Sequence, residues 1–367
     1  MSRLEELIAE LCPDGVEYCP LEKCCNILDN RRKPVTKAAR EVGEFPYYGA
    51  NGIQDYVSDY IFDGTFVLVG EDGSVITKAG TPVVTWATGK IWVNNHAHIV
   101  EEVDGVLLRY LFHFIQTINV TPLIHGNIPK LTGGDFKALS IPVPPLPVQR
   151  EIVRILDNFT ELTAELTAEL TARKKQYEYY RDELLTFGDD VPRAKLGDVS
   201  DISRGVRVVK KQLIPDGTYP VYQNSLAPMG YYDKHNCYAN TTYVISAGAA
   251  GEIGFCDKDF WAADDCLVFS NLNGVIDKYI YYFLMTKQDF IRANVRTASI
   301  PRLSRTVLEN LQIPLLSLEE QRRIVSILDR FDTLCNDIST GLPAEIAARQ
   351  KQYEYYRDKL LTFKELT

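Results

Sequence analysis

Apolar residues recur every three or four positions over two long stretches of the chain. This spacing places them on one face of a helix, so it predicts two long amphipathic helices. The first is expected over about residues 148–187, and the second begins near residue 317. The apolar seam of the first helix contains Ile152, Leu156, Phe159, Leu162, Leu166 and Leu170, and that of the second contains Ile324, Leu328, Phe331, Leu334 and Ile338.

The ends of these helices carry signals of their own. Prolines within residues 142–147 precede the first helix, and proline is tolerated in a first helical turn but breaks what lies before it. Ser317, followed by two acidic residues, is typical of a helix start. Gly341-Leu342-Pro343 predicts a break or kink within the second helix.

The rest of the chain, residues 21–145 and 195–315, has a different pattern. Short β-rich runs alternate with glycine-rich turns, at residues 65–69, 81–86, 242–246 and 266–269. Each region also contains a segment with helical spacing, at 106–118 and 279–285. We therefore expect a mixed α+β domain before each long helix, with a short helix and a turn in residues 1–20.

The two halves of the chain are copies of one unit. Residues 175–187 read KQYEYYRDELLTF, and residues 351–363 read KQYEYYRDKLLTF. QREIVRILDNF from Gln149 matches QRRIVSILDRF from Gln321, and Ile-Pro-Lys-Leu at 128–131 matches Ile-Pro-Arg-Leu at 300–303. The repeat divides the chain into a first domain (1–145), a central helix (146–188), a second domain (189–316) and a C-terminal helix (317–367). Nearly identical helices beside diverged domains suggest two readers of different things on a shared frame.

Two seamed helices of similar length in one chain are expected to pack together as a coiled coil. A zipper between two copies of the chain is one possibility. We favour antiparallel pairing within the chain, because a direct repeat whose helices run antiparallel acquires a pseudo-two-fold axis. The predicted fold is thus α+β, with two α/β domains separated by two long antiparallel helices in an intramolecular coiled coil. That symmetry suits DNA, whose backbone has the same dyad.

Composition narrows the setting. No apolar run approaches the roughly 20 residues that a membrane span needs, so no membrane partner is expected. The eight cysteines include no CxxC pair, and we interpret them as reduced, mostly buried thiols of a cytoplasmic protein. The net charge of −9 argues mildly against nucleic-acid binding, but local patches rather than the mean attract phosphates. Basic residues cluster in both domains, as Arg31, Arg32, Lys33, Lys37 and Arg40, as Arg204, Arg207, Lys210 and Lys211, and as Arg292, Arg296, Arg302 and Arg305.

The sequence offers no catalytic motif. It lacks the spacing of a phosphate-binding P-loop, the glycine pattern of a dinucleotide-binding or S-adenosylmethionine fold, and the NPPY or DPPY signature of an adenine methyltransferase. His96-Ala97-His98 could supply half of a metal site, but no third ligand stands at a suitable spacing. Turn or surface histidines are the simpler interpretation.

Polar loop residues remain as candidates for nucleic-acid binding, and in both domains they run up to and into Ile-Pro-Lys/Arg-Leu. Asn and Gln pair bidentately with adenine, and Arg pairs with guanine, through the major groove. Each residue alone is also typical of a turn or a solvated surface, so the recurring placement is what favours DNA. The candidates are Asn51, Asn94, Asn95, His96, His125, Asn127 and Lys130 in the first domain and Gln223, Asn224, Ser246, Arg296, Ser299, Arg302 and Ser304 in the second.

With these motifs, the chain resembles the DNA-specificity subunit of a type I restriction-modification system. The QREIVRILDNF and QRRIVSILDRF helix starts, the KQYEYYRD(E/K)LLTF ends and the repeated Thr-Ala-Glu-Leu run carry the resemblance, which covers essentially the whole chain. It implies a subunit without enzymatic activity whose two target-recognition domains each read half of a split DNA sequence, while the helices set the gap.

The resemblance also implies partners. Two modification subunits, adenine methyltransferases that use S-adenosylmethionine, are expected to dock around the helices, and restriction subunits with ATP-driven translocation to join them. No cofactor is expected in this chain itself, with S-adenosylmethionine, ATP and Mg²⁺ belonging to the partners. The tyrosine-rich helix faces are predicted to bind modification subunits, since tyrosine is favoured at interfaces. The tyrosines proposed for this contact are Tyr177, Tyr180, Tyr353 and Tyr356.

Two other functions stay open from the sequence. The chain could act alone, as an orphan DNA-binding or scaffold protein that resembles a specificity subunit. An enzyme with its own nuclease or methylation activity is the third class, and the missing motifs oppose it.

Overall fold

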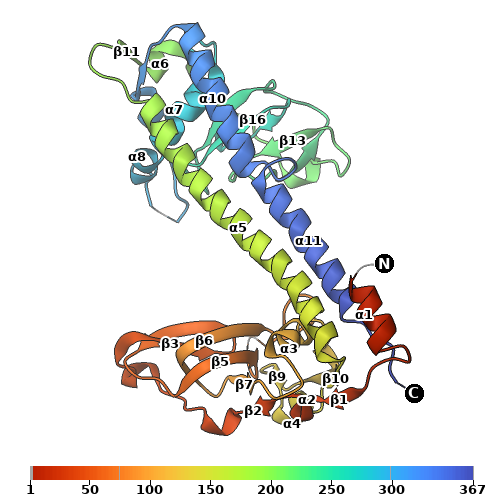
Figure 1. Cartoon of the computed structure of the whole chain (residues 1–367). Helices are drawn as coiled ribbons and strands as arrows, with labels where there is room; N and C mark the ends of the chain where they lie inside the picture. Colours follow the sequence, from red (N-terminus) through yellow and green to blue (C-terminus); the bar gives the residue numbers. More distant parts are fainter. Residues whose placement is uncertain (1–2, 74, 298, 367) are drawn as a thin grey trace. The chain divides into compact units, whose positions relative to one another are not determined.

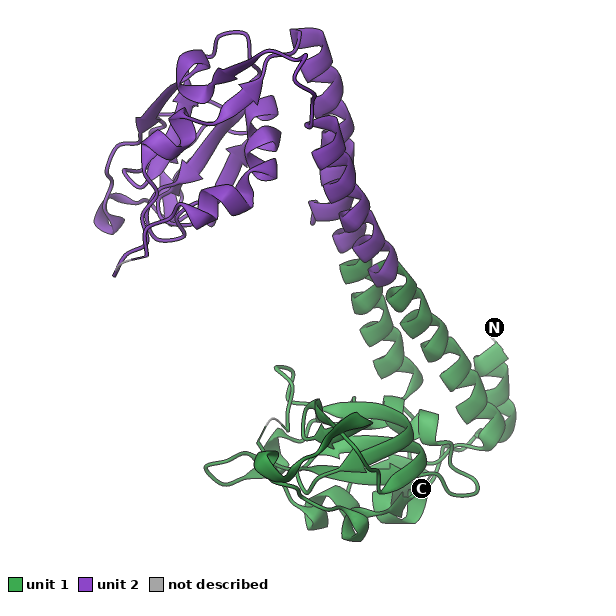
Figure 2. Cartoon of the chain, turned by 90° about the vertical axis from the view of Figure 1, so that its left-hand side faces the viewer, with its two compact units in different colours: residues 1–166, 346–367 green, residues 167–345 purple. Residues whose placement is uncertain are grey.

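The computed structural model describes residues 3–73, 75–297 and 299–366, and it contains two mixed domains and the long helices (Figure 1). The chain divides into two compact units, each of which joins one mixed domain to part of both long helical stretches (Figure 2). Unit 1 comprises Met1–Leu166 and Ile346–Thr367, and unit 2 comprises Thr167–Glu345. The predicted α+β fold class, with two mixed domains and long helices, is confirmed.

Unit 1 is built on a six-stranded sheet with the strand order β2-β7-β5-β6-β3-β4. Neighbouring strands are antiparallel except β3 and β6, which run parallel. In chain order the strands are β2 (Asn26–Ile27), β3 (Val42–Gly49), β4 (Gly52–Val57), β5 (Phe62–Gly70), β6 (Val84–Val93) and β7 (Ala97–Glu101). Two short pairs complete the unit, β1 (Tyr18–Pro20) with β10 (Ser140–Pro142) and β8 (Ile124–His125) with β9 (Lys130–Leu131).

Unit 2 repeats this plan with shorter strands in separate small sheets. One sheet has the order β12-β18-β15-β16 and another the order β14-β13-β17, in which β13 and β17 run parallel as β3 and β6 do. The strands are β11 (Arg193–Lys195), β12 (Asp201–Arg204), β13 (Tyr219–Tyr222), β14 (Gly230–Tyr232), β15 (Thr241–Ile245), β16 (Ile253–Cys256), β17 (Trp261–Ala262), β18 (Cys266–Ser270) and β19 (Gln312–Pro314), which pairs with β11.

The helices fall into the same two sets. Unit 1 contains α1 (Arg3–Leu11), α2 (Leu21–Cys24), α3 (Leu108–Ile115), α4 (Gly133–Lys137) and the 3-10 turns η1 (Asp29–Arg31), η2 (Lys37–Ala39) and η3 (Thr121–Leu123). Unit 2 contains α6 (Leu196–Val199), η4 (Lys210–Gln212), α7 (Asp277–Thr286), α8 (Gln288–Ala293), α9 (Arg305–Glu309) and α10 (Leu318–Asn336). The units share α5 (Leu146–Leu184) and the start of α11 (Leu342–Leu360). Among the described residues, no helix is long and apolar enough to cross a membrane.

Helix α5 is continuous over 39 residues, as the apolar seam predicts. Its middle consists of Leu, Ala, Glu and Thr, and three of these residue types have high helix propensity. The threonines return their hydroxyl groups to the backbone one turn earlier, as Thr163 does to the Phe159 carbonyl at 2.8 Å, so they leave no polar group unpaired. Ile152 and Leu156 are buried, whereas Leu162 is 36% exposed, so the apolar contact is closest near the domain.

The long helices pair antiparallel. As the residue number along α5 increases, the residue number of the partner on the second helical stretch decreases. In unit 1 Phe159 stacks on Tyr356 of α11, with ring centroids 5.4 Å apart. In unit 2 Tyr180 stacks on Phe331 of α10 at 5.6 Å. The predicted intramolecular pairing therefore takes place within each unit.

The second helical stretch is interrupted where the glycine and proline predicted a break. Helix α10 ends at Asn336 and α11 begins at Leu342. A Cβ on Gly341 would lie 2.4 Å from the Thr333 carbonyl oxygen, so only glycine fits this tight reversal. Ile338 was predicted to belong to the apolar seam, and this is wrong: it lies in the interruption and is 84% exposed.

Each long helical stretch docks onto its domain through a buried glutamine. Gln149 accepts from the Leu107 amide at 2.9 Å and donates to the carbonyls of Gly105 and Pro144 at 3.0 and 2.7 Å. Gln321 makes the same three bonds in unit 2, from the amide of Ile276 and to the carbonyls of Gly274 and Leu316. Repeated sequence therefore gives repeated contacts, and the frame of the two units is the same.

Candidate nucleic-acid interface

The predicted polar residues gather at one corner of each unit, and matching backbone hydrogen bonds define this corner. In unit 1 the Glu71 amide donates to the His96 carbonyl, and the Leu131 amide donates to the Glu71 carbonyl, both at 2.8 Å. In unit 2 the Ser246 amide donates to the Asp265 carbonyl at 2.6 Å, and the Leu303 amide donates to the Ser246 carbonyl at 2.8 Å. Glu71 therefore corresponds to Ser246, His96 to Asp265 and Leu131 to Leu303.

A third pair of bonds supports this correspondence. The Asn94 amide donates to the Tyr48 carbonyl at 3.0 Å, and the Ala263 amide donates to the Tyr222 carbonyl at 2.9 Å. In both units, a tryptophan in the parallel strand pair makes the same kind of hydrogen bond to a backbone carbonyl. Trp92 donates its indole N–H to the Lys33 carbonyl at 2.6 Å, and Trp261 donates to the Val206 carbonyl at 2.7 Å. The corner is one backbone arrangement that carries two different sets of side chains.

In unit 1 the corner is hollowed into a cavity of about 530 Å³. Asn51 reaches it from the β3–β4 turn, Gln54 from β4, and His96 from the turn between β6 and β7. Asp72 holds the His96 ring through its Nδ1 atom. The other lining residues are Ala50, Gly73, Ile128 and Lys130.

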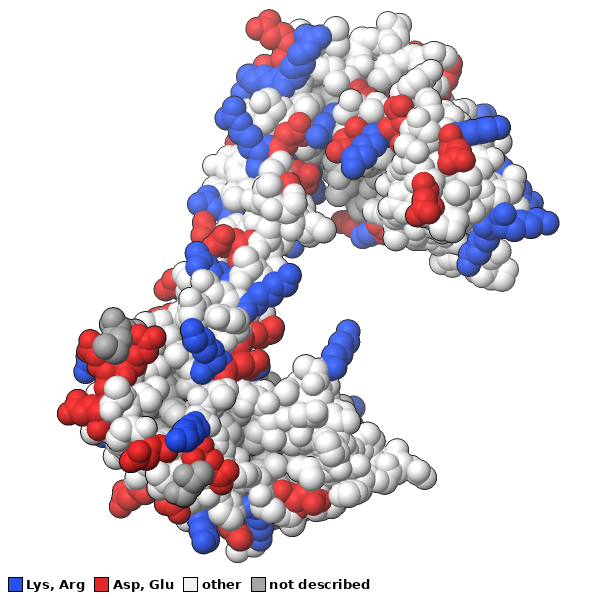
Figure 3. All heavy atoms as spheres, turned by 90° about the vertical axis from the view of Figure 1, so that its right-hand side faces the viewer, with Lys and Arg blue, Asp and Glu red and all other residues white. Residues whose placement is uncertain are grey.

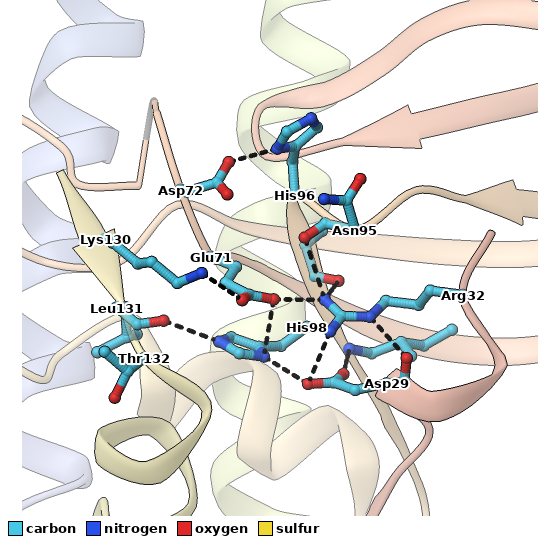
Figure 4. Close-up of polar contacts among 12 residues, drawn as sticks. Asp29, Arg32, Glu71, Asp72, Asn95, His96, His98, Lys130, Leu131 and Thr132 are labelled. Carbon is cyan, nitrogen blue, oxygen red and sulfur yellow. Dashed lines mark hydrogen bonds and ion pairs between the residues drawn. The ribbon is translucent and has the colours of Figure 1, made fainter. Parts of the chain in front are cut away.

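Beneath this cavity lies a network of charges (Figure 4). His98, which is fully buried, contacts Asp29 through Nδ1 at 2.6 Å and the Leu131 carbonyl through Nε2 at 3.1 Å. A carboxylate and a carbonyl only accept hydrogen bonds, so both ring nitrogens donate. Arg32 and Lys130 then contact Glu71 at 2.6 and 3.1 Å. The network ties β7, η1 and β9 into one rigid support.

This network is the only group among the described residues whose side chains could hold a metal ion, through Asp29, Glu71 and His98. It does not fit a cation well, because Arg32 and Lys130 already supply two positive charges to its carboxylates. His96 and His98 point to different carboxylates, Asp72 and Asp29. Each histidine of the His-Ala-His sequence therefore contacts its own carboxylate, and the two rings do not converge on one metal site.

Among the described residues, unit 2 has no such network at the same place. The position of Glu71 carries Ser246, whose hydroxyl donates to the Asp265 carbonyl at 2.9 Å. Arg302 and Arg296 exchange two backbone hydrogen bonds, and their exposed side chains make no ion pair with the residues that the structure describes. Arg302 is thus available to DNA, whereas Lys130, its sequence counterpart, is already paired with Glu71.

The other predicted DNA contacts differ in their surroundings. His125 Nε2 lies 3.3 Å from the Asp135 carboxylate, and Arg31 lies over the Phe62 ring. Gln223 is half-buried and contacts Asp265. The remaining exposed candidates are Lys33, Lys37, Asn51, Asn95, Asn127, Arg204, Arg207, Lys210, Asn224, Ser299 and Ser304.

Three candidates are placed in the interior. Asn94 is 2% exposed, where it accepts from the His96 amide and shapes the turn. Ser246 is also 2% exposed. Neither side chain can reach a base, so their role is to fix the backbone and not to contact DNA. Arg32 is held by Asp29 and Glu71 and is likewise structural.

Sequence reasoning missed three residues of the corners: Gln54, Asp72 and Asp265. Asp72 and Asp265 carry the same sign of charge as phosphates, so a pattern of basic and amide residues does not include them. Pairing the β-strands of the two halves, as well as their helices, places both acids beside the predicted polar turns.

The tyrosines of the repeated helix ends differ in exposure. Tyr177 is 7% exposed, so its prediction as a partner contact is corrected: packing against Phe331 makes it part of the core. Tyr353 is half-buried and hydrogen-bonds His113. Tyr180 and Tyr356 stack within the chain but keep exposed edges. Tyr179 and Tyr355, at 64% and 62%, are the most exposed tyrosines of this repeat.

Charge is distributed unevenly over the surface. Figure 3 shows acidic side chains gathered over the end of unit 1 that carries α1, whose sequence includes Glu5, Glu6 and Glu10. This surface repels phosphates, and it accounts for part of the net charge of −9. The mean charge therefore does not describe the corners.

Comparison with known proteins gives the family. The family model described as "Type I restriction modification DNA specificity domain" matches twice, at residues 13–173 and 189–348. A Haemophilus influenzae protein named as a type I restriction enzyme specificity subunit is 39% identical over 95% of this chain and 96% of its own length. The EcoR124I/EcoR124II specificity subunit of Escherichia coli is 35% identical over 71% of this chain and 72% of its own.

A solved structure has the same fold. The crystal structure of the S subunit of a type I restriction-modification system from M. genitalium aligns with a TM-score of 0.67 over 95% of this chain and 96% of that one, at 16% identity. Two matches to the family model fall on the two copies of the repeat, and the Haemophilus influenzae relative matches over nearly the full length of both chains. The chain belongs to the family of type I restriction enzyme specificity subunits.

Proposed function

We propose that this chain binds double-stranded DNA at a bipartite target, with the corner of unit 1 reading one half-site and the corner of unit 2 reading the other. The observation that carries this proposal is the single backbone frame with two different sets of side chains, His96, Asp72 and Lys130 against Asp265, Ala247 and Arg302. A frame that is kept while its polar side chains change is what reading two sequences requires.

The long helices are proposed to dock two modification subunits. Each unit has a groove where its helix meets its domain, and the two grooves share three equivalent lining positions. One is lined by Leu107, Val153 and Asp157 and encloses about 910 Å³, and the other by Ile276, Val325 and Asp329 and encloses about 640 Å³. The repeated sequence places equivalent residues in both, which supports two copies of one partner.

Catalysis is assigned to these partners. The chain is proposed to carry no cofactor of its own, with S-adenosylmethionine bound by the modification subunits and ATP and Mg²⁺ by restriction subunits that join the complex. The role left to this chain is to position the methyltransferases on a chosen sequence.

The experiment is to assemble the chain with its modification subunits and sequence the methylome of cells that express the complex. A bipartite motif with a fixed spacer is the expected result, and Arg302→Ala should relax or weaken only the half read by unit 2. A loss of about 1–3 kcal/mol at one position is expected for a base contact. An Arg302→Ala variant that changed the other half-site would refute the two-reader proposal.

A further inference from the structure

The position of His96 and Asp265 is where the two corners differ most in chemistry. Both residues lie in the same turn, between the strand that pairs parallel (β6 or β17) and the strand that follows it in the chain (β7 or β18), and both carbonyls accept the same backbone bond. Their neighbours differ too. Asp72 pairs with Lys130 in an isolated antiparallel β-bridge, and Ala247 pairs with Arg302 in the same way, so Asp72 corresponds to Ala247.

In unit 1 this position presents a ring nitrogen. Asp72 occupies Nδ1 of His96, and the ring is 46% exposed, so Nε2 is directed to the cavity rather than to the protein. Figure 4 shows His96 with Asp72 at one side of the ionic network of His98 and Glu71. The Asp72 carboxylate fixes the tautomer and the orientation of the ring.

In unit 2 the same position presents a carboxylate. The backbone carbonyl of Asp265 holds the turn in place, since it accepts hydrogen bonds from both the amide and the hydroxyl of Ser246. Among the described residues, the carboxylate itself has one hydrogen-bond contact, and it is long, 3.5 Å from Gln223 Nε2 to Oδ2; the side chain is half-buried. Gln223 follows Tyr222, where unit 1 has Gly49 after Tyr48, so this contact exists in unit 2 alone.

We propose that Asp265 reads the half-site of unit 2 by accepting a hydrogen bond from the exocyclic amino group of a cytosine or an adenine, at the position where unit 1 uses His96. The inference rests on the proposed function, in which this corner faces DNA. It makes the turn residue, rather than the surrounding basic residues, the determinant of which base is accepted.

The chemistry of a carboxylate selects this class of ligand. Its oxygens only accept hydrogen bonds, and in the major groove only the N4 amino group of cytosine and the N6 amino group of adenine donate. Guanine and thymine present acceptors there, so each would leave the carboxylate facing another acceptor. Arg302, on the neighbouring backbone segment, supplies a positive charge that offsets the repulsion between Asp265 and phosphates.

The test uses the complex of the chain with its modification subunits and duplexes that carry the methylome-defined target. Within the half-site of unit 2, each cytosine is replaced in turn by 2-pyrimidinone and each adenine by purine, which lack the amino group. One replacement should weaken binding by the wild-type complex by roughly 5- to 150-fold, the range of a lost base contact. The same replacement should have little effect on the Asp265→Ala complex, because the acceptor is already gone. The base that responds distinguishes cytosine from adenine.

Asp265→Asn and Asp216→Asn provide the matched controls. Asparagine keeps the shape of Asp265 but adds a donor, so the methylome of Asp265→Asn should accept further bases at that one position and keep the half-site of unit 1. Asp216 is exposed in a turn outside the corner, and its variant should keep the wild-type motif. Equal sensitivity of wild type and Asp265→Ala to every analogue would overturn the inference, while a wild-type complex without a bipartite motif would instead overturn the proposed function.

Discussion

His98 joins three segments of unit 1 through bonds that its counterpart in unit 2 cannot make. Strand pairing places His98 opposite Val69 and Leu267 opposite Val244, at the same point of each sheet. Burial alone would raise the pKa of Asp29, but the hydrogen bond and charge of His98, the Ile99 amide and Arg32 together hold it below its ordinary value. Unit 1 is thus stabilised by buried charges where unit 2 uses apolar packing.

Replacing His98 by leucine should destabilise unit 1. The change removes the two hydrogen bonds that His98 donates, to the Asp29 carboxylate and to the Leu131 carbonyl, while Asp29 keeps the Ile99 amide and Arg32; the expected cost is about 2–3 kcal/mol. Chemical denaturation followed by hydrogen exchange in each unit measures the effect, which should be confined to unit 1. The lowered pKa of Asp29 also predicts that its contribution is present above pH 3.8 and is lost as the pH falls further. An unchanged midpoint for His98→Leu would show that the network is passive.

Asp277 gives unit 2 the opposite pH dependence. Burial raises the pKa of Asp277 to about 6, although the Thr242 amide and hydroxyl donate to its carboxylate. A group whose pKa is raised on folding contributes stability below its unfolded value, and this is lost as the pH rises through the folded value. The free energy of unfolding of unit 2 should therefore fall by on the order of 2–3 kcal/mol between about pH 4 and pH 6. Asp277→Asn, which keeps the acceptor oxygen, should flatten this profile, and an equally steep profile in the variant would contradict the assignment.

At the scale of elements, one buried glutamine holds α10 to the domain of unit 2. Gln321 is fully buried and holds three backbone groups of unit 2. Gln321→Ala leaves these groups unpaired, so a loss of about 2–3 kcal/mol is expected in thermal or chemical unfolding. Gln350→Ala, at an exposed position of α11, is the control and should change stability by less than about 0.5 kcal/mol. Equal effects of the two substitutions would mean that the docking bonds contribute nothing.

The repeated tyrosines separate packing from partner binding. Tyr179 and Tyr355 have exposed rings in both copies of the repeat, so the double substitution Tyr179→Ala and Tyr355→Ala should weaken assembly with modification subunits on a sizing column and leave the unfolding midpoint unchanged. Tyr177→Ala should do the reverse and lower stability by about 3–5 kcal/mol, because it empties a core position. Full assembly of the double variant would place the partner contact elsewhere.

The elements show how far sequence alone reaches. Helix periodicity predicted α5, the capping signal at Ser317 predicted the start of α10, and glycine and proline predicted the break before α11. All three are local signals in the sequence. The local sequence does not predict which polar side chains are buried. Asn94 and Ser246 have the composition of loop readers, yet tertiary bonds turn both inward. Asp265 was missed because its partners, Gln223 and Ser246, are distant in sequence and meet it only when the strands pair.

On the scale of the whole molecule, the Thr-Ala-Glu-Leu run of α5 is predicted to act as a spacer. Each four-residue unit lengthens a helix by about 6 Å and turns it by about 400°, so the added leucine stays near the apolar seam. B-DNA rises about 3.4 Å per base pair, so deleting Thr163–Leu166 should shorten the non-specific spacer by roughly one or two base pairs. Methylome sequencing of the deletion strain reports spacer and half-sites together. A passive helix would give the same spacer, or only a loss of stability.

The central claim is that one frame carries two independent readers, and a domain exchange tests it most directly. The Leu21 amide meets the Leu139 carbonyl at 2.8 Å, and the Leu196 amide meets the Leu311 carbonyl at 2.9 Å, so the two domains have equivalent junctions. Replacing residues 197–310 by a copy of residues 22–138 therefore keeps the frame. Methylome sequencing of this variant should find the half-site of unit 1 on both sides of the spacer, in opposite orientations. A motif that keeps the original second half-site would contradict the account.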